Sequence, residues 1–238
     1  MTIKAVLFDL DGTLLPMDMD DFIKGYFGAL AKYLKPYGYE KEELIKTLWL
    51  GVGAMVKNDG SCLNEDAFWK AFADVYGEKS IEHKPIINEF YKNEFNSVQG
   101  VCGYNKEASE VVELVESMGK TAVLATNPVF PQVATESRAR WAGLELSKFA
   151  AYTTYENCHY CKPSLEYYKE LLERVGFEPE ECIMVGNDFD EDIIPAQKLG
   201  MKTFLLTDYI INKREQEYSA YPHGGFYELK AFLKTELE

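Results

Sequence analysis

Short apolar runs that alternate with helix-like segments limit this chain to a few possible folds. Beyond residue 100, apolar runs at Thr121–Ala125, Cys182–Val185 and Thr203–Leu206 each lead into polar residues. Amphipathic segments separate these runs, and a glycine follows each segment, as helix C-termini favour. This repeated order predicts a doubly wound (Rossmann-like) α/β fold with a parallel sheet. Two further strands are expected at Ala5–Phe8 and Ala150–Thr153, and helices at Lys106–Met118, Gln132–Ala142, Ser164–Val175 and Asp190–Leu199.

The stretch from residue 17 to residue 100 follows a different pattern. Its apolar residues recur at intervals of three and four, as in Phe22, Tyr26 and Leu30, which is the spacing of one helix face. We therefore expect an all-helical insert, residues 17–100, within an α/β core domain of residues 1–16 and 101–238. Its aromatic residues (Trp49, Phe68, Trp69, Phe72, Tyr76) are most simply its own core, although some should face the functional site. The expected helices are Asp20–Tyr37, Lys41–Val56, Asn64–Tyr76 and Ile81–Asn96, with a last helix of the chain from Tyr227.

The charge of the chain bears on its partners and location. A formal net charge of -14 disfavours nucleic acid and anionic membranes as partners. It also slows the approach of a phosphate anion, so a phosphate site here would need a locally positive pocket or a metal. The first apolar run meets two aspartates at once, unlike a signal peptide, and no run approaches the ~20 apolar residues of a membrane helix. With five cysteines and no secreted framework, we expect a reduced, cytoplasmic protein.

Polar side chains follow the predicted strands, where parallel sheets bind ligands. Asp9 and Asp11 come directly after the first strand, and Thr126 follows the strand at 121–125. Lys162 precedes a helix. The loop after the strand at 182–185 carries Asn187, Asp188 and Asp192.

These residues carry a resemblance to a known family. Asp9-Leu10-Asp11-Gly12-Thr13 resembles the signature of the haloacid dehalogenase-like superfamily. Three further elements resemble the remaining signatures and occur in the family's order: Thr126 after a strand, Lys162 before Pro163, and the acidic loop Val185–Asp192. The resemblance covers the whole chain. The helical insert matches the cap domain of the family's first subclass, which lies between the first two signatures.

The residue types suit the chemistry that the resemblance implies. A carboxylate such as Asp9 can attack phosphorus and form a mixed anhydride, which divides one difficult displacement into two steps. Asp11 can donate a proton to the leaving oxygen and then take one from water. Thr126 and Asn127 can donate hydrogen bonds to a phosphate oxygen. Lys162 would neutralise the phosphate and hold Asp9 ionised.

Two carboxylates and a phosphate in one pocket require a cation, and Mg²⁺ prefers such oxygen ligands. By resemblance, Asp9, the backbone carbonyl of Asp11 and an acidic residue of the last loop would bind it. Many relatives carry Asp where Asn187 stands, whereas the family's shorter spacing, counted back from Asp192, selects Asp188. We expect Asp188 to bind the metal directly, with Asn187 as the alternative ligand. Asp192 is expected to contact the ligands rather than the metal itself. Some of these acids could instead cap the next helix.

The sequence therefore predicts a Mg²⁺-dependent phosphohydrolase that acts on a small phosphorylated metabolite through an aspartyl-phosphate on Asp9. A phosphosugar mutase of the same superfamily is the alternative enzyme. A non-catalytic protein that binds a phosphorylated ligand is the alternative of another class, and the presence of Asp9, Asp11 and Lys162 together disfavours it. Dehalogenases and phosphonatases of the superfamily usually lack an acid at the position of Asp11, so the presence of Asp11 disfavours both of these activities.

Two further features lie outside these motifs. Cys158 and Cys161 have a zinc-like spacing but no second cysteine pair, so a loop beside Lys162 is the simpler interpretation. The joins near Leu15–Asp18 and Gly100–Gly103 suit a chain that leaves and re-enters a domain, and we expect hinges there.

Overall fold

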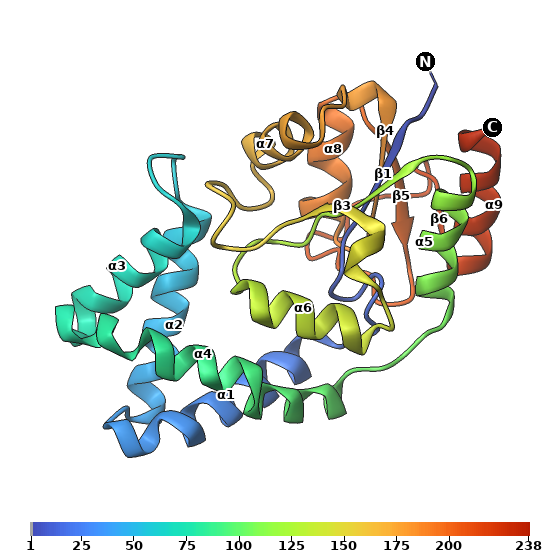
Figure 1. Ribbon diagram of the computed structural model, residues 1–238. Coiled ribbons are helices and arrows are strands. Elements are labelled where there is room, and N and C mark those ends of the chain that lie inside the picture. Colours follow the sequence, from blue (N-terminus) through green and yellow to red (C-terminus); the bar gives the residue numbers. More distant parts are fainter. Residues whose placement is uncertain (1) are drawn as a thin grey trace.

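The computed structural model describes residues 2–238 and contains one parallel sheet with the strand order β3-β2-β1-β4-β5-β6 (Figure 1). From the central strand β1, the chain builds outward to β2 and β3 on one side and then to β4, β5 and β6 on the other. This is the doubly wound arrangement that the sequence predicts. The strands are β1 (Ala5–Phe8), β2 (Thr121–Leu124), β3 (Phe149–Tyr152), β4 (Cys182–Gly186), β5 (Lys202–Leu206) and β6 (His223–Gly224).

The register of the three central strands brings their carboxyl ends to one level. Phe8 of β1 pairs with Leu124 of β2 and with Val185 of β4. The pairing continues past the strand end, because the N–H of Asp9 donates to the carbonyl of Val185 at 2.9 Å. The residues that follow β1, β2 and β4 therefore open onto one edge, at the point where the strand order reverses and such sheets bind ligands.

Helices cover both faces of the sheet, because neighbouring residues of a strand point to opposite sides. Val6 and Phe8 belong to the apolar cluster that includes α5 and α9, whereas Ala5 and Leu7 pack with α7 and α8. Figure 1 shows the two helix pairs on opposite sides of the sheet. These helices are α5 (Glu107–Ser117), α7 (Leu165–Val175), α8 (Ile194–Lys198) and α9 (Phe226–Leu237).

The predicted helical insert follows β1 and forms the other part of the molecule (Figure 1). Asp18 begins its first helix, since the Asp18 carboxylate accepts the backbone N–H groups of Asp20 and Asp21 at 3.0 Å each. The helices of the insert are α1 (Met19–Leu34), α2 (Lys41–Val56), α3 (Asn64–Tyr76) and α4 (Lys84–Lys92), with 3₁₀ turns η1 (Lys35–Tyr37), η2 (Glu78–His83) and η3 (Glu94–Val101).

Two expected helices are divided in the structure. The segment 81–96 contains the end of η2, then α4, then part of η3; Pro85 lies in the first turn of α4, where its missing N–H costs nothing, and Asn93 leaves the helical conformation at φ -117 and ψ -81. The segment 190–199 begins as a π-helical turn, η6 (Phe189–Ile193), and Pro195 lies in the first turn of the short α8 that follows. The remaining short turns are η4 (Leu146–Lys148) and η5 (Pro179–Glu181).

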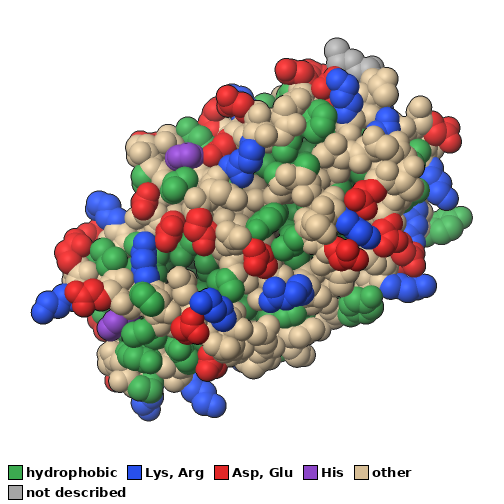
Figure 2. Space-filling model, in the orientation of Figure 1, with side chains coloured by type: hydrophobic (Ala, Val, Ile, Leu, Met, Phe, Trp, Pro, Cys, Tyr) green, Lys and Arg blue, Asp and Glu red, His purple; other side chains and the backbone are tan. Residues whose placement is uncertain are grey.

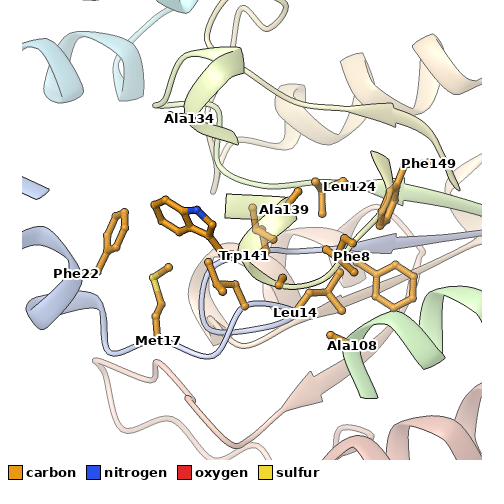
Figure 3. Close-up of a cluster of buried hydrophobic side chains, with 14 of the residues drawn as sticks. Phe8, Leu14, Met17, Phe22, Ala108, Leu124, Ala134, Ala139, Trp141 and Phe149 are labelled. Carbon is orange, nitrogen blue, oxygen red and sulfur yellow. The ribbon is translucent and has the colours of Figure 1, made fainter. Parts of the chain in front are cut away.

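One apolar cluster connects the sheet with the insert. Helix α6 (Gln132–Trp141) lies between them, and Trp141 packs 5.0 Å from the ring of Phe95. Figure 3 shows the cluster running from Phe149 and Phe8 of the sheet, past Trp141, to Phe22 of α1. The α1 side of the insert is therefore anchored to the core by aromatic packing.

The two linkers of the insert lie side by side. Met17 and Cys102 form an isolated antiparallel bridge, and the N–H of Gly103 donates to the carbonyl of Pro16 at 2.7 Å. A Cβ atom at Gly103 would lie 2.9 Å from the Cβ of Pro16, so the close approach requires glycine. The chain thus enters and leaves the insert at a single place.

Acidic and basic side chains are interspersed over the face of the molecule in Figure 2. Within residues 2–238, the structure has no helix with both the length and the apolar character needed to cross a membrane.

Candidate functional site

Asp9 and Lys162 form a buried ion pair at the end of β1. The Nζ of Lys162 lies 2.8 Å from Oδ1 of Asp9 and 2.7 Å from Oδ1 of Asp192. Burial alone lowers the pKa of Lys162, but the carboxylates of Asp192 and Asp9 outweigh burial and raise this pKa well above its usual value. Lys162 is therefore a permanent cation that faces the Asp9 carboxylate.

Asp192 supports Lys162 from behind. Its Oδ2 accepts the backbone N–H of Asp188 at 3.0 Å, and its Oδ1 accepts from Lys162. Gly186 makes room for it, because a Cβ there would lie 2.1 Å from Oδ2 of Asp192. Burial raises the pKa of Asp192, although the ammonium of Lys162 opposes this effect. Both oxygens of Asp192 are thus used within the protein.

Asp11 is paired with a residue that the motifs do not include. Its carboxylate forms an ion pair with the guanidinium of Arg138, a fully buried residue of α6 that also lies over the ring of Phe130 at 4.2 Å. Within residues 2–238, Oδ1 of Asp11 has no hydrogen-bond partner. Burial raises the pKa of Asp11, and Arg138 works in the opposite direction. A carboxyl group of raised pKa with a free oxygen is suited to donating a proton.

Thr13 joins the first signature to the loop after β4. Its hydroxyl lies 3.0 Å from Oδ2 of Asp9 and 3.0 Å from Oδ1 of Asn187, and its single proton can serve one of them at a time. The Nδ2 of Asn187 donates to the carbonyl of Tyr209 at 2.6 Å, which orients the amide. Gly12 permits this arrangement, since a Cβ there would lie 2.3 Å from Nδ2 of Asn187. The oxygens of Asp9 and Asn187 therefore face the same hydroxyl.

Asp188 caps the π-helical turn η6. Its Oδ1 accepts the backbone N–H groups of Asp190 and Glu191 at 2.9 Å each. Burial raises the pKa of Asp188. Burial and then the charge of Asp188 raise the pKa of the neighbouring Glu191 to about 7. Asp188 and Glu191 thus add two carboxyl groups to a site that already holds Asp9, Asp11 and Asp192.

Thr126 and Asn127 follow β2. The carbonyl of Thr126 accepts the hydroxyls of Thr153 at 2.6 Å and Tyr167 at 3.0 Å, which fixes this strand end. The Oδ1 of Asn127 accepts a hydrogen bond from the backbone N–H of Lys162 at 3.3 Å, and the Nδ2 of Asn127 donates to the carboxylate of Glu191 at 3.0 Å. The amide that the sequence suggests as a phosphate donor is thus engaged with protein atoms at both ends.

Most of the predicted site residues meet in one cavity of about 290 Å³. Lys162 adjoins it through its contacts with Asp9 and Asp192. Sequence reasoning missed three contributors, Thr13, Arg138 and Glu191. It assigned Trp49 to the core of the insert, whereas Trp49 lines this cavity and is 48% exposed. The predicted residues on the cavity wall are Asp9, Asp11, Thr126, Asn127, Asn187, Asp188 and Asp192.

The donor set around Asp9 fits a hard cation through mixed oxygen ligands. Within residues 2–238, no group of three or more His, Cys, Asp or Glu side chains is arranged to hold a metal ion. Mg²⁺ does not need one, because it commonly binds through one or two carboxylates together with waters and substrate phosphate. Asp9 supplies a carboxylate and Asn187 an amide oxygen, and both of these groups face the hydroxyl of Thr13.

Cys158 and Cys161 belong to the loop before Lys162. Both are buried, and burial raises the pKa of both thiols. Cys161 packs against Met55 of α2 and Tyr155, and Nδ2 of Asn64 lies 3.3 Å from its Sγ. These contacts attach the loop to the insert.

Comparisons with known proteins agree with this fold. The chain is 27% identical to a pyrophosphatase, PpaX, of Bacillus cereus over 207 residues, which cover 85% of this chain and 82% of that protein. It is 39% identical to a glyceraldehyde 3-phosphate phosphatase of Methanocaldococcus jannaschii over 75 residues, 31% and 33% of the two chains. The crystal structure of a HAD phosphatase from Thermococcus onnurineus superposes with a TM-score of 0.61 at 22% identity, covering 99% of this chain and 100% of that one. The model of the haloacid dehalogenase-like hydrolases matches residues 3–200, and the chain belongs to this family.

Proposed function

We propose that this protein is a Mg²⁺-dependent phosphohydrolase that cleaves small phosphate esters through an aspartyl-phosphate on Asp9. The observation that carries this proposal is the buried contact between Asp9 and Lys162, beside Asp11 and within a cavity that the helical insert covers. The ammonium of Lys162 lies against the Asp9 carboxylate, the proposed nucleophile, and it offsets the charge of an incoming phosphate.

The reaction follows from these positions. A carboxylate oxygen of Asp9 attacks phosphorus, the bond from phosphorus to the alcohol oxygen breaks, and Asp11 gives its proton to that oxygen. Water then attacks the phosphorus of the aspartyl-phosphate and gives a proton to Asp11, which releases phosphate and restores both carboxyl groups. The raised pKa of Asp11 supports its role as the proton donor, and Arg138 holds it in position.

Asp9, the backbone carbonyl of Asp11 and either Asn187 or Asp188 would hold the Mg²⁺ ion. When bound, the ion offsets the negative charge of the phosphate and of the surrounding carboxylates. The sequence favours Asp188, but Oδ1 of that residue caps η6, whereas the Asn187 oxygen faces Thr13 beside Asp9. We therefore prefer Asn187 as the third ligand. Asp192 would not bind the metal directly, because it is the partner of Lys162.

We propose that the protein acts in the cytoplasm and that its substrate is a small phosphorylated molecule. The relatives named above act on pyrophosphate and on glyceraldehyde 3-phosphate, so both compounds belong in a first panel. A phosphosugar mutase would use the same acid pair but would convert a sugar phosphate to its isomer without releasing phosphate.

Phosphate release from p-nitrophenyl phosphate with Mg²⁺ tests the proposal. The wild-type protein should turn over, and Asp9→Asn should lose activity while keeping its circular dichroism spectrum, because an amide is a poor nucleophile of nearly the same shape. Turnover of Asp9→Asn near the wild-type rate would exclude the covalent mechanism. Isomer formation in place of phosphate release from a sugar phosphate would favour the mutase.

A further inference from the structure

The cavity beside Asp9 has two chemically different walls. The core domain supplies the acidic and polar residues at one end. The insert supplies aliphatic and aromatic side chains from α1, α2, α3 and α4, among them Phe27, Leu48, Val52 and Phe68. Among the described residues of the insert, none that lines this cavity is charged or carries an amide.

The hydroxyl groups on this apolar wall are already paired. Tyr26 and Tyr91 are buried, and their hydroxyl oxygens lie 2.5 Å apart. One polar group on this wall is free, because the buried indole N–H of Trp69 has no hydrogen-bond partner among the described residues. A sugar or nucleotide placed here would bury most of its hydroxyls against hydrocarbon, and each one left without a partner costs about tenfold or more in binding. An alkyl or aryl group would gain from the same wall, since burying apolar surface is favourable.

From this wall we infer that the preferred substrate carries an apolar alkyl or aryl alcohol, whose hydrocarbon part occupies the insert side of the cavity while the phosphate lies at Asp9. The inference rests on the proposed phosphatase function and adds the class of leaving group. The cavity of about 290 Å³ lies at the lower end of the range of about 300–1,000 Å³ that is usual for ligand sites, so it suits a short alkyl chain or a single ring. A second, larger cavity of about 750 Å³ adjoins the first, since Asp11, Trp49 and Asn187 line both.

A homologous substrate series tests the inference on the wild-type protein. We would measure kcat/KM from phosphate release for ethyl, butyl, hexyl and benzyl phosphate, with glycerol 3-phosphate, glucose 6-phosphate and pyrophosphate as polar comparisons. The value should rise about three- to fourfold per added methylene, since one buried CH₂ group contributes about 0.8 kcal/mol. Hexyl and benzyl phosphate should exceed every polar compound by at least about tenfold.

A pair of matched variants locates the effect. Val52→Thr keeps the shape of a lining side chain but adds a hydroxyl, and it should reduce the ratio of hexyl to ethyl kcat/KM several-fold. Val75→Thr makes the same change on an exposed part of α3 away from the cavity and should leave that ratio unchanged. Thermal unfolding of both variants checks that they fold.

A binding measurement separates this inference from the proposed function. Alkylphosphonates cannot be hydrolysed, and calorimetry should show their affinity rising from ethyl- to hexylphosphonate whether or not any ester turns over. If neither kcat/KM nor affinity rose with chain length, or if pyrophosphate were the best substrate, the inference of an apolar leaving group would be overturned. The proposed phosphatase function would still stand. No phosphate release from any ester, with phosphonate affinity still rising with chain length, would overturn the phosphatase and leave an apolar ligand site.

Discussion

The buried guanidinium of Arg138 forms an ion pair with Asp11, although 127 positions separate the two residues in the chain. Asp11 belongs to the signature beside β1, and Arg138 lies in the middle of α6. A fully buried cation needs a partner, and removing one member of such a pair leaves an uncompensated charge. Helix α6 is therefore tied to the proposed proton donor, and Arg138 acts as a positioning residue for it.

Substitution of Arg138 should move the pH dependence of activity. Arg138 lowers the pKa of Asp11 against the effect of burial. In Arg138→Met this pKa should rise further, so Asp11 should stay protonated to higher pH and the alkaline limb of kcat should shift upward by about one unit or more. We expect kcat to fall about tenfold with a smaller change in KM, because the carboxyl group is no longer held in place.

Two controls accompany that measurement. Arg138→Lys retains the charge and should leave the alkaline limb near its wild-type position. Arg140→Met changes an exposed arginine of the same helix, whose Nη2 donates to Ser137, and should leave the profile unchanged. An unshifted limb in a folded Arg138→Met protein would remove Arg138 from the control of Asp11.

Lys162→Met should destabilise the protein more at high pH than at low pH. The raised pKa of Lys162 means that its stabilising charge is present throughout the neutral range and is lost only as the pH rises through that high value. Without it, Asp9 and Asp192 lose their cation, and the pKa of Asp192, which burial already raises, should rise further above that of the unfolded chain. The unfolding free energy should then fall by about 3–5 kcal/mol at pH 7.5 and by less at pH 5.

Urea denaturation at the two pH values measures this effect. Lys169→Met is the matched control, because Lys169 forms only an exposed pair with Glu166 on α7, and it should cost less than about 1 kcal/mol at either pH. Equal losses at pH 5 and pH 7.5 in Lys162→Met would show that the charge of Asp192 does not depend on this cation.

Removal of Mg²⁺ should abolish turnover without unfolding the chain. The cavity gathers several carboxyl groups, which repel a phosphate ester when no cation is present. EDTA should therefore stop phosphate release, and added Mg²⁺ should restore it. Unfolding should remain cooperative, with bound metal adding up to about 2.7 kcal/mol at one hundred times its dissociation constant. Undiminished turnover in metal-free buffer would argue against the metal.

The two candidate ligands of the last loop can be separated by alanine substitutions. Asn187→Ala removes the amide oxygen that faces Thr13, and it should raise the Mg²⁺ concentration for half-maximal activity more than tenfold. Asp188→Ala removes the cap of η6 and should mainly lower the thermal midpoint, since a lost N-cap costs about 1 kcal/mol. The reverse ranking of the two Mg²⁺ requirements would restore Asp188 as the ligand, as the family's shorter loop spacing predicts.

The fold was predictable because its signals are local. Apolar strands ending at Asp9 or Thr126, with a glycine after each helix, specify the doubly wound sheet and the edge at which chemistry occurs. The exact helix ends were less accessible where a single residue decides them: Asn93 ends α4 inside a segment whose apolar spacing continues. The two-residue strand β6 is too short to leave a periodic pattern.

The site was only partly predictable, for a physical reason. Arginine is a residue type that is usually exposed, so nothing in the sequence places Arg138 at Asp11; only the tertiary fold brings the two together. Helical spacing likewise predicts that Phe22 and Phe68 face inward, but it cannot distinguish a filled interior from a hollow one. The proposed domain boundaries at residues 16 and 100 and the roles of the individual site residues remain predictions.

The paired linkers also have a mechanical consequence. Because Met17 is bridged to Cys102 and Pro16 is bonded to Gly103, the two chain connections of the insert lie along one short line, and its other attachments to the core are non-covalent side-chain and loop contacts. We expect any motion of the insert to be a swing about that line, with sideways sliding resisted by the bond between the two linkers. Asp11 lies a few residues from the line and would travel little, whereas the far ends of α2 and α3 would sweep the widest arc. Substrate could then enter past the moving wall without disturbing the groups that react with it.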